Sequence, residues 1–256
     1  YFGIATWTGD GNNRFIEYGM QPDLFVVKAR NDSYRVGWFD SVRGFKNVIW
    51  SDQTLAETYS ATYPEDPTPT GITVNNDDGQ TNQNTKTYVG WTWKAGGNKN
   101  TFNVDDVGYA SAADAGLDGG TIDPIGASVG TKQGFSILKW TGTSGNGTLS
   151  HGLTEAPNFV IVKANYTGGN WPCYHSGLTD ATKYIWLNST SGENTQVAAW
   201  NSTAPTSNLF HVGGEAEVNR NGYTSIAYLW HDVPGLQKFG KYSGSGSDDG
   251  TFVECG

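Results

Sequence analysis

The amino-acid sequence predicts an all-β protein made of two tandem β-sandwich domains, followed by the start of a third repeat. Three observations predict this fold class. Strand-like segments recur in the same order in both halves of the chain, as in an internal duplication. Glycine (35 residues) and aromatic residues (13%) are abundant, and no stretch has the i, i+3, i+4, i+7 apolar spacing of a helix. Turn sequences such as "TGDGNN", "NYTGGNW" and "VNRNGY" separate the segments, as hairpins require.

The first repeat is predicted to span residues 1–95 and the second residues 134–236. Each opens on a strand containing a tryptophan, so that Trp7 of "ATWTG" corresponds to Trp140 of "LKWTG". Gly19 and Gly152 then correspond to each other. The remaining pairs are, in order, "DLFVVKAR" (23–30) with "NFVIVKAN" (158–165), "WFDS" (38–41) with "CYHS" (173–176), "KNVIWS" (46–51) with "KYIWLN" (183–188), and "TYVGWTWK" (87–94) with "TSIAYLWH" (224–231).

Two of these pairs predict how strands are buried. "DLFVVKAR" and "NFVIVKAN" are continuously apolar, which is typical of a central strand covered on both faces, and their lysines are expected at strand ends. "TYVGWTWK" and "TSIAYLWH" instead suggest alternation, since side chains point to opposite faces at period 2. We therefore expect one face to be buried in a core, with Gly90 and Thr92 on the other. The expected core side chains are Val89, Trp91 and Trp93 in the first repeat and Ile226, Tyr228 and Trp230 in the second.

Three further segments complete the predicted organisation. "DQTLAETYS" at 52–60 favours one short helix with Asp52 as its cap. Residues 96–133 are rich in Gly, Ala and Asp and are expected to be a linker, either a disordered tether or an extended arm lying on a neighbouring subunit. Residues 237–256 resemble the opening of the chain, with Tyr242 at the position of Trp7. The chain is expected to be a segment of a longer protein, because its first residues already have the pattern of a strand.

Charge and hydropathy exclude several classes of protein. The formal net charge is −9 and no basic stripe is present, so we predict no nucleic-acid partner. No run approaches the ~18 apolar residues of a membrane span. The low lysine content favours an extracellular location. Cys173 and Cys255 stand in no metal-ligand spacing, and a disulfide between them is possible without being required.

No enzyme signature is present with convincing spacing, and we predict no catalytic residue. His175 and Ser176 are adjacent, so on a strand they would point to opposite faces. Asp40 and Arg43 in "FDSVRG" are expected to form a local ion pair that shapes a turn. The alternative is that Arg43 binds a substrate carboxylate or a sugar.

Cofactors are not expected, with Ca²⁺ as an open alternative. Adjacent acids occur in Gly- and Asn-rich stretches at Asp77-Asp78, Asp105-Asp106 and Asp248-Asp249. Such loops supply oxygen ligands for Ca²⁺, but none fits the twelve-residue calcium-loop pattern. Solvated turn residues are the other interpretation.

Four tryptophans are candidate glycan contacts: Trp38, Trp171, Trp186 and Trp200. They flank variable loops or alternate with polar residues, and exposed aromatic rings near Asn, Asp and His can stack on a sugar face. The alternative is that these rings pack the second sheet or a subunit interface.

The motifs together resemble a family of tandem domains in bacteriophage virion proteins, common in marine phages and cyanophages. The resemblance is carried by "GMQPDLFVVKAR", "WFDSVRG", "YVGWTWKAGG", "HGLTEAPNFVIVKA", "CYHSGL", "TAPTSNLFHVG" and "KFGKYSGSGSDDGTFVECG". It implies jelly-roll or concanavalin-like sandwiches in a non-enzymatic structural protein, and it transfers no catalytic residue.

The sequence-based expectation for function follows from this resemblance. We expect a tail fibre, appendage or capsid decoration on the virion surface, which adheres to the host or assembles with other virion subunits as a homo-oligomer. A lectin-like module that binds a host-surface glycan is the alternative, and a glycan-degrading enzyme is a third. No membrane partner is expected.

Overall fold

The computed structural model describes residues 1–75 and 78–254. Its regular structure is almost entirely β, which confirms the predicted fold class. Strands pair into two large and two small sheets, and packed sheets bury the apolar side chains. Asp77 and Cys255 lie outside the described residues. Within the described part, no helix is long and apolar enough to cross a membrane.

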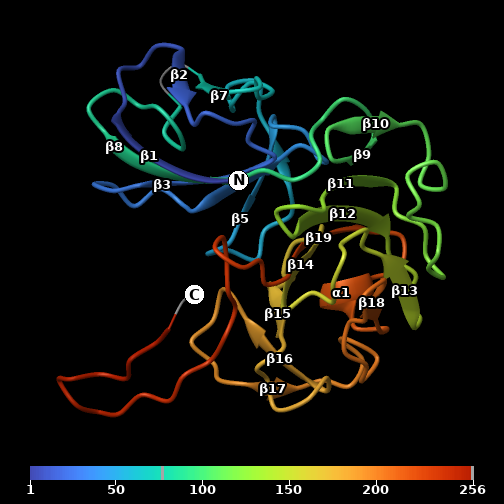
Figure 1. The fold of residues 1–256 in the computed structure, drawn as a ribbon. Coiled ribbons are helices and arrows are strands. Elements are labelled where there is room, and N and C mark those ends of the chain that lie inside the picture. Colours follow the sequence, from blue (N-terminus) through green and yellow to red (C-terminus); the bar gives the residue numbers. More distant parts are fainter. Residues whose placement is uncertain (76–77, 255–256) are drawn as a thin grey trace.

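The first repeat forms a six-stranded sheet in the order β1-β8-β3-β4-β5-β6 and a two-stranded sheet of β2 and β7 (Figure 1). The first and last strands of the repeat, β1 and β8, lie side by side and antiparallel. The strands are β1 Phe2–Thr8, β2 Arg14–Glu17, β3 Leu24–Ala29, β4 Gly37–Asp40, β5 Asn47–Trp50, β6 Thr58–Tyr59, β7 Gly71–Val74 and β8 Thr87–Trp93.

The second repeat has the same strand order with three additional strands. Its large sheet runs β10-β9-β11-β12-β19-β14-β15-β16-β17, and its small sheet pairs β13 with β18. From β12 to β17 this order matches the first sheet strand for strand, as the internal duplication predicts. The elements are β9 Phe102–Val104, β10 Val107–Tyr109, β11 Gly126–Gly130, β12 Phe135–Thr141, β13 Gly147–Ser150, β14 Phe159–Ala164, β15 Pro172–His175, β16 Lys183–Trp186, β17 Asn194–Thr195, β18 Leu209–Val212, α1 Ala216–Asn219 and β19 Thr224–Trp230.

The turn before the central strand is also duplicated. Gly19 has φ +68° and Gly152 has φ +70°, a left-handed conformation that glycine adopts without steric cost. The two glycines that correspond in sequence therefore correspond in backbone geometry.

The segment 96–133 differs from both predictions made for it. It is neither a tether nor an arm on another subunit, because β9, β10 and β11 extend the sheet of the second repeat. Phe102, Leu117 and Val129 are buried in the core of that repeat. A few apolar residues among many glycines were enough to order this segment, because every residue of β11 pairs with a residue of β12 in the antiparallel sheet.

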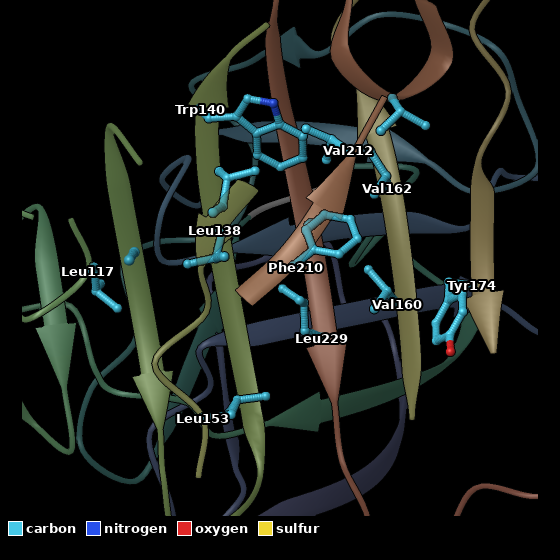
Figure 2. Close-up of a cluster of buried hydrophobic side chains, with 14 of the residues drawn as sticks. Leu117, Leu138, Trp140, Leu153, Val160, Val162, Tyr174, Phe210, Val212 and Leu229 are labelled. Atoms are coloured by element: carbon cyan, nitrogen blue, oxygen red, sulfur yellow. The ribbon is translucent and has the colours of Figure 1, made fainter. Parts of the chain in front are cut away.

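The apolar side chains form three layers between four sheets. One cluster lies between the six-stranded sheet and β2–β7, and includes Phe25, Phe39 and Tyr88. A second lies between the nine-stranded sheet and β13–β18, where Phe210 and Val212 of β18 lie over β12, β14 and β19 (Figure 2). The third joins the two large sheets face to face. We call this third cluster the inter-repeat seam; it comprises Leu24, Val26, Trp38, Ile49, Ala95, Phe135, Ile137, Ile161, Trp171, Cys173, Ile226, Tyr228 and Trp230.

The seam explains the two recurrent apolar strands. In β3, Phe25 and Val27 face the core of the first repeat, while Leu24 and Val26 face the seam. In β14, Val160 and Val162 face the second core and Ile161 faces the seam. The prediction of central strands covered on both faces is confirmed.

The prediction for β8 needs a correction. Trp91 and Trp93 are only partly buried and pack on the seam, whereas Tyr88, Gly90 and Thr92 form the fully buried face. A Cβ at Gly90 would stand 2.6 Å from the Phe25 ring and 2.6 Å from the Tyr18 hydroxyl. Gly90 therefore faces a crowded core, and period-2 alternation alone could not identify which face that core would cover.

One local prediction was wrong. Residues 52–60 form no helix; they contain β6, and the Asp52 carboxylate accepts a hydrogen bond from Val36 N.

The start of a third repeat at residues 237–256 stays a prediction. Its described residues, 237–254, form none of the named strands, and Tyr242 is 70% exposed.

Candidate functional site

Three of the four candidate glycan contacts are buried. Trp38 and Trp171 lie in the inter-repeat seam, with ring centroids 5.5 Å apart. The Trp171 indole N–H donates to the Gln53 carbonyl at 3.1 Å. Trp200 lies in the core of the second repeat and donates to the Lys183 carbonyl at 3.0 Å. None of these three rings can stack on a sugar, so the packing interpretation is correct for them.

Trp186 is the fourth candidate, and it is partly exposed. Its indole N–H donates to Glu217 Oε2 at 2.9 Å, and the other oxygen of that carboxylate accepts from Asn170 Nδ2 at 2.7 Å. The Tyr184 ring lies edge-on at 5.2 Å. An aromatic ring, a carboxylate and an amide therefore meet at the surface of the second repeat, although their mutual hydrogen bonds already engage the indole N–H.

The predicted ion pair of Asp40 and Arg43 is confirmed, and its setting is the seam. Arg43 Nε lies 2.6 Å from Asp40 Oδ2, and Nη1 lies 3.0 Å from Glu57 Oε2. Arg43 Nη2 donates to the Trp38 carbonyl at 2.9 Å. The guanidinium is buried and surrounded by acceptors of its own chain, so it is not placed to bind a substrate carboxylate.

The charge of Arg43 survives this burial. Burial by itself lowers the pKa of a guanidinium, but the neighbouring Asp40, Tyr228 and Glu57 raise the pKa of Arg43 above its ordinary value. A buried charge of this kind is tolerated because it is paired and hydrogen-bonded.

Hydrogen bonds cross the seam from the first repeat to the second. The Tyr228 hydroxyl donates to Asp40 Oδ2 at 2.7 Å, and burial raises the Tyr228 pKa well above its ordinary value. The Glu57 amide donates to Asn165 Oδ1 at 2.7 Å, and the Gly168 amide donates to the Thr54 carbonyl at 2.7 Å. The loop expected to be a helix is thus a strap that ties the two repeats together.

Lys28 and Lys163 occupy equivalent places near the ends of β3 and β14, as predicted. The Lys163 ammonium donates to the Ala164 carbonyl at 2.7 Å, and that of Lys28 donates to the Ala29 carbonyl at 2.6 Å. Lys163 is fully buried beside a cavity of about 10 Å³ that Arg43 and Glu57 also line. Burial lowers the Lys163 pKa to about 8.

Three of the remaining candidate groups, His175, Asp105 and Asp106, have structural partners. His175 Nδ1 accepts a hydrogen bond from the Gly177 amide at 2.8 Å. Asp105 accepts from the amide and the hydroxyl of Thr131, at 2.9 and 2.6 Å, and Asp106 pairs with Lys94 at 2.6 Å. Among residues 1–75 and 78–254, no group of three or more His, Cys, Asp or Glu side chains could hold a metal ion.

One apolar surface that the sequence did not single out lies on β1. Phe2 is 45% exposed and Ile4 is 58% exposed, next to the partly buried Trp91 and Trp93 of β8. Phe2 and Trp93 touch, with ring centroids 5.0 Å apart. The sequence contains a signal for this apolar surface, because Phe2 and Ile4 alternate with small residues in "YFGIATW". It contains no signal for the position of this strand at the edge of a sheet.

Comparison with known proteins gives a family without an assigned activity. No curated protein and no solved structure matches the chain. A family described as "Domain of unknown function (DUF7483)" matches residues 1–256. The two repeats, the segment between them and the C-terminal segment all fall within this match, and the chain therefore belongs to the DUF7483 family.

Proposed function

We propose that this protein is a non-enzymatic structural component of a bacteriophage particle, displayed on the virion surface as a tail fibre, appendage or capsid decoration. It works by assembly with other virion subunits, including copies of itself, and by contact with the host surface. The observation that carries the proposal is the inter-repeat seam, which joins two duplicated domains through their large sheets.

The seam supports a structural role because of what it buries. Trp38, Trp171 and Tyr228 meet there, with ring-centroid distances of 5.5 and 5.2 Å from Trp38. Burial of a large side chain contributes about 1.5–3 kcal/mol, and aromatic pairs add about 0.5–1.5 kcal/mol. Two domains joined in this way form one stiff block with a fixed relative orientation, as a fibre or shell subunit requires.

The open apolar end of the first sheet supports assembly. Phe2 and Ile4 are large, exposed and adjacent across the strand pair to Trp93 and Trp91. Contiguous exposed apolar groups on a protein surface mark sites of association. The net charge of −9 makes copies of the protein repel one another, so that particles stay dispersed except where specific contacts form.

Immunogold electron microscopy of purified phage particles tests the proposal. Antibodies raised against this chain should label a defined place on intact particles, on the tail or over the shell. Light scattering of the purified chain gives the number of subunits in its assembly. Antibody signal found only in the soluble lysate, with unlabelled particles, would refute a virion role.

Glycan binding is the second candidate, and Trp186 with Glu217 and Asn170 favours it. These side chains supply a ring face and polar groups at one partly exposed place. A glycan array with the intact chain, Trp186→Ala and Tyr242→Ala tests it; Tyr242 is an exposed aromatic residue far along the chain and serves as the control. Glycan binding that is lost only in Trp186→Ala supports this candidate, and equal binding by all three proteins removes Trp186 from it.

A further inference from the structure

β1 forms an unusually long free edge. The two large sheets end in β1, β6, β10 and β17, and the last three of these have only 2, 3 and 2 residues. β1 has 7 residues, with the sequence "FGIATWT". Natural proteins protect edge strands with short length, proline or charged side chains. β1 has none of these, so its edge is open to pairing with another strand.

The hydrogen bonds of β1 show which backbone groups are free. Lys94 N donates to the Tyr1 carbonyl at 2.9 Å, and Gly9 N donates to the Lys86 carbonyl at 2.7 Å. Odd-numbered residues of β1 therefore bond to β8, because antiparallel pairing uses alternate residues. The backbone groups of Phe2, Ile4 and Thr6 point to the other side, where the described part of the chain places no strand.

The far end of this edge is closed by a side chain. Arg14 Nη1 donates to the Thr8 carbonyl at 2.9 Å, and Arg14 lies 3.6 Å from Asp10. The free stretch is thus limited to Phe2, Ile4 and Thr6.

The second repeat shows how the same edge is completed. Phe2 lies opposite Trp93, and Phe135 lies opposite Trp230; Phe2, Ile4 and Thr6 are therefore equivalent to Phe135, Ile137 and Lys139. In β12 the backbone N–H and C=O groups of these three residues point toward β11. The Lys139 carbonyl, for example, accepts a hydrogen bond from Ile125 N at 2.7 Å. The length of β12 that β11 covers matches the length of β1 that is free.

Burial differs between the two repeats at these positions. Phe135 is 1% exposed and Ile137 is 0% exposed, against 45% for Phe2 and 58% for Ile4. Part of this difference comes from the seam, which covers Phe135 and Ile137, and β11 closes their open flank.

We infer that the free edge of β1 is a strand-accepting site. It takes one antiparallel strand of the β11 type, with small residues in the sequence pattern "GASVG", supplied by another repeat of the same family. This inference rests on the proposed function and names the contact through which assembly occurs.

The register follows from the second repeat. There Gly130 lies opposite Phe135, Ser128 opposite Ile137 and Gly126 opposite Lys139. The incoming strand accordingly places Gly opposite Phe2, Ser opposite Ile4 and Gly opposite Thr6. Small residues at these positions leave room for the large side chains of β1, as cross-strand neighbours lie only about 4.5–5.5 Å apart.

A graft onto the full chain tests the site. Residues 121–134 are fused directly ahead of Phe2 in place of Tyr1, because Gly134 of the second repeat and Tyr1 of the first hold equivalent places before their strands. The Gly134 carbonyl bonds to His231 N and the Tyr1 carbonyl to Lys94 N, so the replacement keeps this contact. Amide hydrogen exchange is then measured residue by residue.

The expected result is at least tenfold slower exchange at the Phe2, Ile4 and Thr6 amides in the graft. The matched control carries Ser128→Pro within the grafted segment alone, which removes the N–H that would bond to Ile4, and should restore fast exchange. Unchanged protection of β3 and β14 amides establishes that each variant is folded.

One result would overturn the inference: equally fast exchange of the three amides in the folded graft and its proline control. This result does not bear on the labelling of phage particles, so the two proposals fail separately.

Discussion

The hydroxyl of Tyr228 in the second repeat donates a hydrogen bond of 2.7 Å to the Asp40 carboxylate of the first. Both residues are fully buried. Asp40 also forms an ion pair with Arg43, in which Asp40 Oδ2 lies 2.6 Å from Arg43 Nε. This hydrogen bond thus links the ion pair of Asp40 and Arg43 in the first repeat to β19, the last strand of the second repeat. The seam depends on this contact because it satisfies a buried carboxylate from the other side.

Loss of the Tyr228 hydroxyl should weaken the seam without changing its shape. Tyr228→Phe is expected to lower the free energy of unfolding by about 1.5–3 kcal/mol, since hydrogen bonds to charged groups contribute that much. Urea denaturation measures the change. Tyr174→Phe is the matched control, because the described structure gives the buried Tyr174 hydroxyl no hydrogen bond. Equal losses in both variants would contradict a specific role for the bond to Asp40.

Removal of Arg43 should cost more. Arg43→Ala leaves Asp40 and Glu57 buried or half-buried without their cation, and breaking a buried pair in this way costs about 3–5 kcal/mol. Thermal unfolding followed by tryptophan fluorescence measures this, because Trp38 and Trp171 lie in the seam. The exposed Arg30 provides the control Arg30→Ala, for which a change within about 0.5 kcal/mol is expected. Similar midpoints for both variants would count against the network.

Lys163 should make stability depend on pH in the alkaline range. Its pKa falls from 10.5 to about 8 on folding, chiefly through burial, so between these values the unfolded chain binds more protons than the folded one. Stability then rises with pH. Relative to Lys163→Met, the wild-type chain should gain about 1–2 kcal/mol between pH 8 and pH 9.5. Lys28→Met, the equivalent change in the first repeat, controls for loss of carbonyl contacts. A difference in unfolding free energy between wild type and Lys163→Met that stays constant from pH 8 to pH 9.5 would contradict the prediction.

Cys173 should be chemically silent in the native protein. Its thiol is buried in the seam, and burial raises its pKa to about 12, so almost no thiolate is present at neutral pH. Maleimide labelling at pH 7.5, read by peptide mapping at this residue, should need unfolding of the chain. The reaction should become complete in 6 M guanidinium chloride. Rapid labelling of the native chain would mean that the seam opens readily.

Much of the fold could be predicted from the sequence because the duplication repeats local patterns. The apolar runs around Val26 and Ile161 predicted central strands, and Gly19 and Gly152 marked equivalent turns. Prediction was weaker where one local sequence pattern is compatible with two different structures. The residues 52–60 have helix-forming composition, yet they serve as the strap across the seam, because Glu57 and Thr54 gain partners there that no local pattern contains.

The candidate site was predicted only in part for a related reason. Asp40 and Arg43 are three residues apart, so their ion pair was readable from sequence. The burial of the tryptophans was not, since Trp38, Trp171 and Trp200 were expected to flank variable loops or to alternate with polar residues, as exposed rings would. Whether such a face meets water or another sheet depends on contacts between residues far apart in the chain.

The sequence by itself determined the all-β class, the duplicated order of strands and the turns between them, because propensity, period and glycine placement act over a few residues. Tertiary structure decided which faces became core and which became seam, and it decided that β1 ends a sheet while its equivalent β12 does not. The physical reason is that burial and strand pairing are properties of two surfaces at once. Equivalent residues such as Ile4 and Ile137 therefore differ in exposure, at 58% and 0%, according to what lies beside them.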